Sequence, residues 1–267
     1  MSLLWSTFLG AVQGITEVLP ISSTAHLVLM PWFFQTPDQG LAFDVALHVG
    51  SLLAIVIAFW PDWVALIKKA STLFARDKNK KVEDKKILLY ILAATIPGAL
   101  AGYFLEDIAE NTLRSPYIIV GTLVIFGILL LLAESRGEKT KSFNEITLRD
   151  ALFIGVAQAV AIIPGVSRSG VTISGGLLRG LKKEEAAKFS FMLSAPIILG
   201  AAAVKVPDLS VEMFKSTAFW GGLGASLIFG FLAIKFILKF VQKKSYRPFV
   251  YYRFALALLI IAFLIWR

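Results

Sequence analysis

The sequence predicts an all-α polytopic membrane protein with six transmembrane helices and two re-entrant helix pairs, arranged as an inverted-topology repeat. Three observations lead to this fold class. The 267 residues are 57% hydrophobic and 17% charged, with a mean hydropathy of +0.75, which excludes both an ordinary soluble domain and a disordered chain. Six apolar runs are long enough to cross a bilayer, and two more apolar stretches are broken in the middle. These segments use up the chain, so we expect a single membrane domain over residues 1–267.

The six unbroken runs satisfy the length requirement of about 20 apolar residues for a spanning helix. They are residues 41–60, 87–105, 117–133, 189–206, 217–238 and 250–266.

The two broken stretches cover residues 3–34 and 151–178, which we call the first and second helix pairs. The first contains Pro20-Ile21-Ser22-Ser23-Thr24 and the second Pro164-Gly165-Val166-Ser167-Arg168-Ser169. A backbone opened at such a place cannot face lipid, because its amide and carbonyl groups need partners. Each pair should therefore enter the membrane, turn inside it and leave on the same side.

The distribution of Lys and Arg predicts the topology. Segments 68–86, 136–149, 179–188 and 239–253 hold 21 of the 27 basic residues, whereas 106–116 and 207–216 are poor in them. By the positive-inside rule the four basic segments are cytoplasmic. Both termini then lie outside, the first helix pair enters from outside, and the second enters from the cytoplasm.

The most basic segment, 68–86, is expected to be a solvated linker that anchors this orientation, with no nucleic-acid partner. The first basic residue of the chain is Lys68. A cleavable signal peptide needs a positively charged start, so the apolar N-terminus is expected to be part of the mature fold.

An internal repeat relates the two helix pairs. At an offset of 145 residues, Gly10-Ala11-Val12-Gln13 aligns with Gly155-Val156-Ala157-Gln158, and Ser22-Ser23-Thr24 aligns with Ser167-Arg168-Ser169. Each pair is followed by three spans, an odd number, so the half 145–267 should be inverted relative to the half 1–135. In such folds the broken helices meet near the bilayer midplane and build the binding site.

Few ionisable residues lie inside the apolar segments, and a functional role is the default expectation for a charge in that environment. Lys205 and Lys235 lie near span ends and can reach the interface, and Asp44 is near an outer end, so a structural role is favoured for these three. The role of His48 is left open. The remaining candidates, Glu17, His26 and Arg168, belong to the breaks. Cysteine is absent, which excludes a thiolate nucleophile and a Cys-based metal site.

The residue pattern at the breaks favours a phosphate or diphosphate site. Gln13 and Glu17 share one helix face that leads into the first break, and Ser22, Ser23 and Thr24 are good N-cap residues for the helix that carries His26. After the second break, Ser167-Arg168-Ser169 should open another helix. Two helix N-termini with an Arg between hydroxyls attract anions, and Glu17 would hold a divalent cation or a proton. The alternative is that the hydroxyls only cap helices and Arg168 only ties the halves together.

At these residues the chain resembles the undecaprenyl-diphosphate phosphatase family, integral membrane proteins linked to bacitracin resistance. The resemblance covers nearly the whole chain and rests on the following segments: Gln13-Gly14-Ile15-Thr16-Glu17, Leu19-Pro20-Ile21-Ser22-Ser23-Thr24-Ala25-His26 and Pro164-Gly165-Val166-Ser167-Arg168-Ser169-Gly170-Val171-Thr172.

The resemblance implies hydrolysis of undecaprenyl diphosphate to the monophosphate and inorganic phosphate, recycling the lipid carrier for cell-wall synthesis in the bacterial plasma (inner) membrane. It also implies a Mg²⁺ or Ca²⁺ requirement. Gln13 stands where many members carry Glu, so metal binding should depend on Glu17 and on the substrate's own phosphates.

The site residues expected from the pattern and the resemblance fall into two groups. The catalytic group is Glu17, Ser23, His26 and Arg168; the substrate-binding group is Gln13, Ser22, Thr24, Ser167, Ser169 and Thr172. Ser23 activated by His26 would form a phospho-enzyme, whereas a water oriented by Glu17 and His26 would hydrolyse the substrate directly. The sequence does not choose between them.

Transport is the rival function, because inverted repeats with broken helices are typical of secondary transporters, and the chain could flip the polyprenyl phosphate carrier. An anion channel is less favoured, since a pore would be lined by a ring of like charges. The expected partners are the polyprenyl diphosphate, the bilayer and a possible second copy of the chain in a homodimer.

Overall fold

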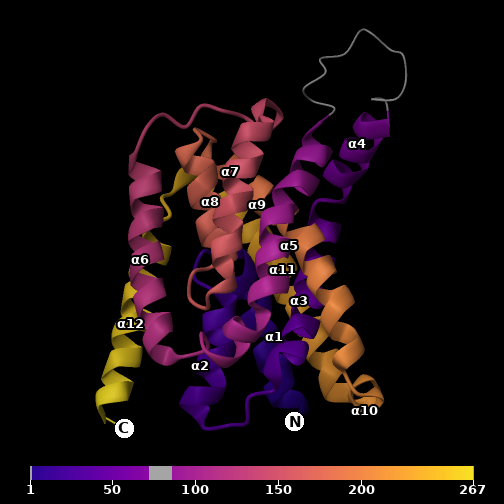
Figure 1. The fold of residues 1–267 in the computed structure, drawn as a ribbon, viewed down its shortest axis with the longest axis vertical. Helices are drawn as coiled ribbons and strands as arrows, with labels where there is room; N and C mark the ends of the chain where they lie inside the picture. Colours follow the sequence, from indigo (N-terminus) through magenta and orange to yellow (C-terminus); the bar gives the residue numbers. More distant parts are fainter. Residues whose placement is uncertain (1, 72–85, 267) are drawn as a thin grey trace.

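The protein is all-α in the computed structural model, which describes residues 2–71 and 86–266 (Figure 1). No strand occurs in these two ranges, where only an isolated bridge joins Lys141 to Leu181. The helices are α1 Leu3–Val18, α2 Ser23–Phe34, α3 Gly40–Ala58, α4 Trp60–Ser71, α5 Ile87–Asn111, α6 Pro116–Ser135, α7 Leu148–Ala159, α8 Arg168–Leu178, α9 Lys183–Lys205, α10 Val211–Lys215, α11 Thr217–Lys243 and α12 Arg247–Trp266. Short 3-10 turns cover Phe143–Glu145, Val160–Ile162 and Val206–Asp208.

The six predicted spans are confirmed as α3, α5, α6, α9, α11 and α12, which are all long and apolar enough to cross a membrane. Two of them extend beyond the apolar runs. Helix α9 begins at Lys183, six residues before the predicted run, and its first turn carries Glu184 and Glu185, which interact favourably with the positive helix end. Helix α5 continues to Asn111. Hydropathy identifies the lipid-embedded part of a helix and misses turns that project into water.

Helix α4 was not predicted from the sequence. It is amphipathic, with Leu66 buried and Lys68 and Lys69 in its last turn, and it contains the first residues of the basic segment 68–86. The rest of that predicted linker, residues 72–85, lies outside the described residues.

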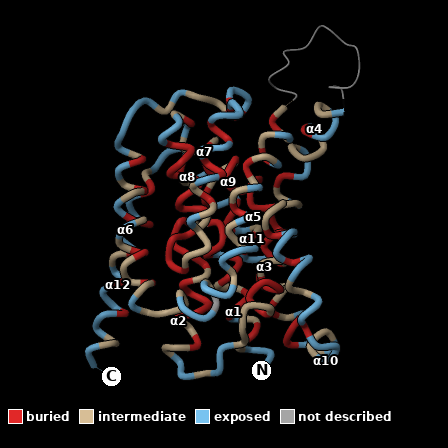
Figure 2. The backbone as a smooth tube through the Cα atoms, in the orientation of Figure 1, coloured by how far each residue is buried: buried red, intermediate tan, exposed pale blue. Residues whose placement is uncertain are grey.

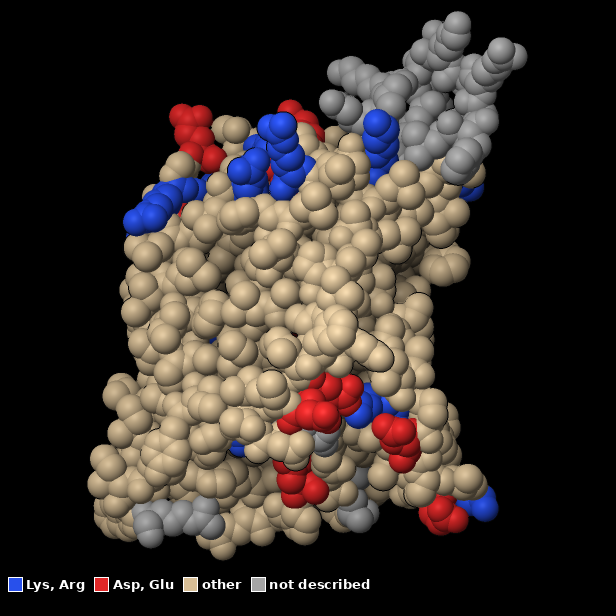
Figure 3. Space-filling model, viewed as in Figure 1, with Lys and Arg blue, Asp and Glu red and all other residues tan. Residues whose placement is uncertain are grey.

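The two helix pairs lie at opposite ends of the molecule (Figure 1). Helices α1 and α2 lie at the end where both termini are found, and α7 and α8 lie at the other end. On the face shown in Figure 3, Lys and Arg side chains are concentrated at the α7–α8 end, a band nearly free of charge follows, and a mainly acidic group lies towards the other end. An uncharged band is expected of a multi-pass membrane protein. The orientation of each pair relative to a bilayer remains a prediction.

The first helix of each pair packs against the second span of the other half, at glycines. A Cβ atom on Gly14 of α1 would lie 2.4 Å from the carbonyl oxygen of Ser226 on α11. A Cβ atom on Gly155 of α7 would likewise lie 2.4 Å from the carbonyl oxygen of Ala94 on α5. Such close backbone contact needs small residues. Because the first helix of each pair packs against the other half, the turns of both pairs lie in the interior of the molecule, where most buried residues are found (Figure 2).

Buried Asp150 connects the start of α7 with the residue that follows α8, so it joins the two ends of the second helix pair that lie away from its turn. Its carboxylate accepts hydrogen bonds from Lys141 at 2.8 Å and from Arg179, the residue after α8, at 2.7 Å. It also forms a capping box with Thr147 at the start of α7. Burial alone would raise the pKa of Asp150, but the hydrogen bonds from Lys141, Thr147 and Arg179 outweigh it and lower the pKa to about 2.

Candidate active site

Helices α2 and α8 begin with the same unusual backbone geometry. Ser22 precedes α2 with φ 74° and ψ 96°, and Ser167 precedes α8 with φ 70° and ψ 107°. Each side chain caps its helix, Ser22 by accepting from the amide of Ala25 and Ser167 from the amide of Gly170. The predicted helix starts are therefore confirmed. A positive φ in a residue other than glycine costs roughly 1–3 kcal/mol and is concentrated at functional sites.

Glu17 lies at the centre of the site. Its Oε2 accepts hydrogen bonds from Gln13 Nε2 at 2.9 Å and from Ser23 Oγ at 2.6 Å, and its Oε1 pairs with Arg168 at 2.7 Å. The Glu17 side chain is only 3% exposed, and that of Arg168 14%. The two motifs, 151 residues apart in the sequence, thus meet at one carboxylate.

The hydroxyls of the second motif hold Arg168 and the turn in place. Thr172 Oγ1 donates to the carbonyl oxygen of Arg168 at 2.7 Å and lies 2.6 Å from Ser190 Oγ on α9. Arg168 also donates to the carbonyl oxygen of Ser190 at 3.2 Å. Ser169 Oγ donates to the carbonyl oxygen of Leu19, at the end of α1, at 3.0 Å. These hydroxyls are therefore engaged with the protein and fix the backbone of the turn, while the guanidinium itself is held by the carbonyl oxygen of Ser190 and by Glu17.

His26 lies away from Ser23, so the Ser23–His26 pairing, one of the two alternatives that the sequence leaves open, is not formed. Its Nδ1 donates to the carbonyl oxygen of Ser22 at 2.7 Å, and its Nε2 lies 2.7 Å from the hydroxyl of Tyr252 on α12. The two rings are stacked, with centroids 5.7 Å apart. Since Nδ1 carries the hydrogen, Nε2 of a neutral ring accepts from Tyr252. The Ser23 hydroxyl points to Glu17 because both flank the same turn, whereas His26 is one turn further along α2.

His48, whose role was open from the sequence, lies in the site. Its Nε2 is 3.2 Å from Glu17 Oε2, and its Nδ1 is 2.7 Å from the carbonyl oxygen of Asp44. Both ring nitrogens face oxygen acceptors, so both carry hydrogens when Glu17 is ionised, and His48 is then an imidazolium. Asp44 pairs with Arg114 at 3.0 Å, in agreement with the structural role favoured for it.

Arg253 on α12 is a residue of the site that the sequence analysis missed. It is completely buried. Its guanidinium donates to the carbonyl oxygen of Pro20 in the first turn at 3.2 Å and to those of Gly165 and Val166 in the second turn at 2.6 and 2.9 Å. Arg253 thus holds both turns at once. It was counted as topological charge, although it falls inside the predicted span 250–266, which could have identified it.

Thr24 and Gln13 are the predicted substrate-binding residues with unused polar atoms. The structure records no hydrogen bond for the half-buried Thr24 hydroxyl, and Gln13 Oε1 is buried without a partner. Both carboxylate oxygens of Glu17 already accept from neighbouring side chains, so a divalent cation there would have to displace one of these contacts, with the Gln13 oxygen as a second protein ligand. No cluster of three or more His, Asp or Glu that could hold a metal occurs in residues 2–71 and 86–266, so a bound substrate would have to supply further ligands. If the substrate's phosphate oxygens complete the coordination, the oxygens of Glu17 and Gln13 fit a hard cation such as Mg²⁺ or Ca²⁺.

The arrangement can bind a multiply charged anion. Arg168 is positively charged, and His48 adds a second positive charge in its imidazolium form, against one negative charge on Glu17. The N-terminal ends of α2 and α8 add positive partial charge and free amides. Ser23 supplies a hydroxyl in contact with a carboxylate, the pairing needed for a nucleophile with its base.

Comparison with known proteins identifies relatives along almost the whole chain. The model of the family described as bacitracin resistance protein BacA matches residues 6–259. The undecaprenyl-diphosphatase of Moorella thermoacetica is 45% identical over 98% of this chain and 98% of its own length. The undecaprenyl-diphosphatase of Caldicellulosiruptor bescii is 44% identical over 100% of this chain and 99% of its own length. That of Thermodesulfovibrio yellowstonii is 46% identical over 94% of this chain and 93% of its own length. The chain therefore belongs to the bacitracin resistance protein BacA family.

Proposed function

We propose that this protein hydrolyses undecaprenyl diphosphate to undecaprenyl phosphate and inorganic phosphate, and so recycles the lipid carrier and confers bacitracin resistance. The observation that carries the proposal is the meeting of Arg168, Glu17 and Ser23 at two capped helix N-termini. The names of the relatives support the same activity.

The diphosphate would lie between the starts of α2 and α8. Their first amides and Arg168 would bind the phosphate oxygens, because fixed donors in a buried site stabilise the charge that develops during phosphoryl transfer. The unpartnered Thr24 hydroxyl would add a donor. The prenyl tail would leave the site between helices and enter the lipid.

Ser23 is the nucleophile that the contacts favour. Its oxygen would attack the terminal phosphorus while its proton passes to Glu17 Oε2, and the bond from that phosphorus to the bridging oxygen breaks to release undecaprenyl phosphate. Water would then hydrolyse the phosphoserine and release inorganic phosphate. His48 would stabilise the carboxylate before the proton transfer. His26 would orient the water only by exchanging its hydrogen bond to Tyr252 for one to the water, because its other ring nitrogen is bonded to Ser22.

A divalent cation, Mg²⁺ or Ca²⁺, would be held by Glu17, with Gln13 Oε1 as a second protein ligand. The cation neutralises charge on phosphate oxygens when bound. Replacing Gln13 by Glu adds a carboxylate beside this position, and the concentration of Mg²⁺ that gives half-maximal activity should fall.

The first test is release of inorganic phosphate from a long-chain prenyl diphosphate in detergent, with Mg²⁺ or with EDTA. Glu17→Gln, Ser23→Ala and Arg168→Lys should each reduce turnover by about 100-fold or more, while Arg149→Lys, on the exposed surface of α7, serves as the matched control. A labelled terminal phosphate should remain on wild-type protein after rapid quenching and be absent from Ser23→Ala. Substantial turnover by folded Ser23→Ala would instead favour direct attack by water.

The bacterial plasma membrane, external termini and a homodimer remain proposals for this chain. Accessibility of introduced cysteines tests the orientation cleanly, because the natural sequence has none. The transport alternative predicts movement of lipid phosphate across sealed vesicles after phosphate release is abolished, and no contact described above favours it.

A further inference from the structure

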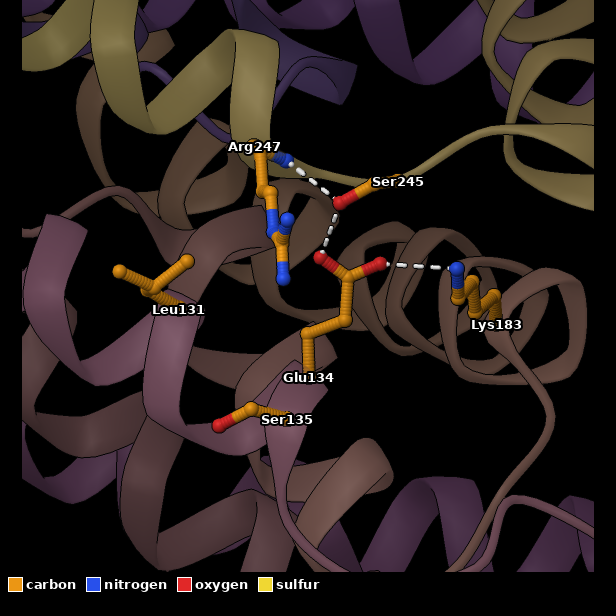
Figure 4. A pocket seen from close by; sticks show the side chains of 6 residues that line it. All are labelled: Leu131, Glu134, Ser135, Lys183, Ser245 and Arg247. Atoms are coloured by element: carbon orange, nitrogen blue, oxygen red, sulfur yellow. Dashed lines mark hydrogen bonds and ion pairs between the residues drawn. The ribbon is translucent and has the colours of Figure 1, made fainter.

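A second polar cavity lies far from the two turns, at the end of the molecule that carries α7 and α8. It is lined by Leu131, Glu134 and Ser135 of α6, Lys183 of α9, Ser245, and Arg247 at the start of α12, and its volume is about 240 Å³ (Figure 4). None of these residues takes part in the site around Glu17.

Glu134 does not neutralise Arg247. Its carboxylate oxygens accept from Lys183 Nζ at 2.9 Å, Ser245 Oγ at 2.6 Å and the amide of Tyr246 at 3.1 Å. The exposed guanidinium of Arg247 extends along the cavity beside Glu134 and forms no ion pair with a described residue (Figure 4). The cavity thus presents a guanidinium that is not bonded to a carboxylate among the described residues, and its planar donor fork matches phosphate oxygens.

Further positive charge surrounds the cavity. Lys139 follows α6, and its pKa is lowered by partial burial, an effect that the negative charge of nearby Glu134 opposes and the positive charge of Lys183 reinforces. Lys139, Lys183 and Arg247 therefore outnumber the nearby carboxylates, Glu134 and Glu184. This excess favours an anion.

The position of the cavity favours a lipid over a soluble anion. It lies where α6 ends and α12 begins, and both helices have 20 residues, about 30 Å or one hydrocarbon thickness. Their ends should lie at the level of lipid phosphates. Exposed apolar side chains extend from this point along both helices, including Ile128 and Leu132 on α6 and Tyr251 and Leu258 on α12, where acyl chains could pack.

We propose that this cavity binds the phosphate of an anionic phospholipid headgroup, with Arg247 as the principal ligand and the acyl chains lying along α6 and α12. Basic pockets between helix ends are suited to such headgroups. The inference does not depend on the activity proposed above.

Native mass spectrometry of the full-length protein in detergent tests the proposal by titration with phosphatidylglycerol, phosphatidylcholine of the same acyl chains, or inorganic phosphate. We expect phosphatidylglycerol to bind more tightly than phosphatidylcholine. Arg247→Gln should weaken its binding about fivefold, the effect of one basic side chain near an anionic lipid, and Arg149→Gln should leave it unchanged. Phosphate release in lipid-free detergent should be the same in both variants.

Three outcomes would overturn the proposal. The first is wild-type affinity for phosphatidylglycerol in Arg247→Gln, and the second is equal affinity of the wild type for the two lipids. The third is displacement of phosphatidylglycerol by an equal concentration of inorganic phosphate, which would make the cavity a site for free anions. Arg247→Lys keeps the charge and should retain part of the binding, which separates loss of charge from misfolding.

Discussion

Replacing Arg253 by methionine tests whether one side chain sets the relative position of the two turns. Methionine is shorter than arginine but unbranched and suited to an apolar interior, so the change removes the guanidinium while the rest of the side-chain volume stays filled. The carbonyl oxygens of Pro20, Gly165 and Val166 then lose a charged donor. On α6, the carbonyl oxygen of Leu123 loses its bond of 3.1 Å to the Arg253 Nε.

The cost follows from these four hydrogen bonds. A hydrogen bond to a charged group contributes about 1.5–3 kcal/mol, and a buried acceptor left without a donor costs about 1–3 kcal/mol. Part of this is offset because the variant no longer buries a guanidinium, so we expect a net loss of about 3–5 kcal/mol. For a chain of this size the loss corresponds to a fall of roughly 10 °C in the melting temperature.

The activity of Arg253→Met should fall further than its stability explains. A displacement of about 1 Å between reacting groups can cost about 100-fold in rate, and the two turns carry Ser23 and Arg168 on opposite sides of the proposed substrate. The assay is phosphate release per folded molecule, measured well below the melting temperature, with Arg149→Met as an exposed control. Arg253→Lys keeps the charge but cannot bond both turns, so its turnover should lie between those of Arg253→Met and the wild type.

A folded Arg253→Met protein that melts within 2 °C of the wild type, by the same size relation, and turns over substrate at its rate would refute this reasoning. The turns would then be held by helix packing alone.

Three further predictions concern packing, backbone strain and pH. Gly14→Ala should destabilise the protein by about 1–3 kcal/mol, because its Cβ would collide with the backbone of α11, whereas Gly224→Ala, with open space on α11, should not lower the melting temperature. Ser22→Ala should melt below Ser22→Gly, since both lose the cap but only glycine relieves the positive φ; equal melting temperatures would contradict the strain argument. Asp150 has a pKa in the folded state, about 2, below its value of about 3.9 in an unfolded chain. The contribution of ionised Asp150 to the stability of the folded state is therefore complete above about pH 4 and is lost as the pH falls towards 2. The difference in melting temperature between wild type and Asp150→Asn should shrink over that range. A constant difference would show that the charge of Asp150 contributes nothing to stability.

The sequence alone was enough to predict the all-helical membrane class, the six spans and the positions of both chain breaks. These features depend on composition and short spacings, because a lipid-embedded helix must be apolar over its whole length and a broken one needs Pro, Gly or capping residues at the break. The amphipathic α4 and the polar first turn of α9 were not predicted, because a search for long apolar runs does not detect helical segments that carry many polar residues. The sequence also identified Glu17, Ser23 and Arg168, since ionisable and hydroxyl groups are rare in such a background.

Only the tertiary structure decided how these residues pair. Ser23 contacts Glu17 and not His26 because the turn at Pro20 directs the hydroxyl back towards the end of α1, a direction that spacing within α2 does not reveal. His48, Tyr252 and Arg253 come from α3 and α12, outside both motifs. His48 reaches Glu17 through packing of α3 against α1 within one half of the chain, whereas Tyr252 and Arg253 reach the site through packing between the two halves. Contacts between segments that are distant in sequence depend on how helix faces fit together, and for that reason the sequence predicted the motifs but not their partners.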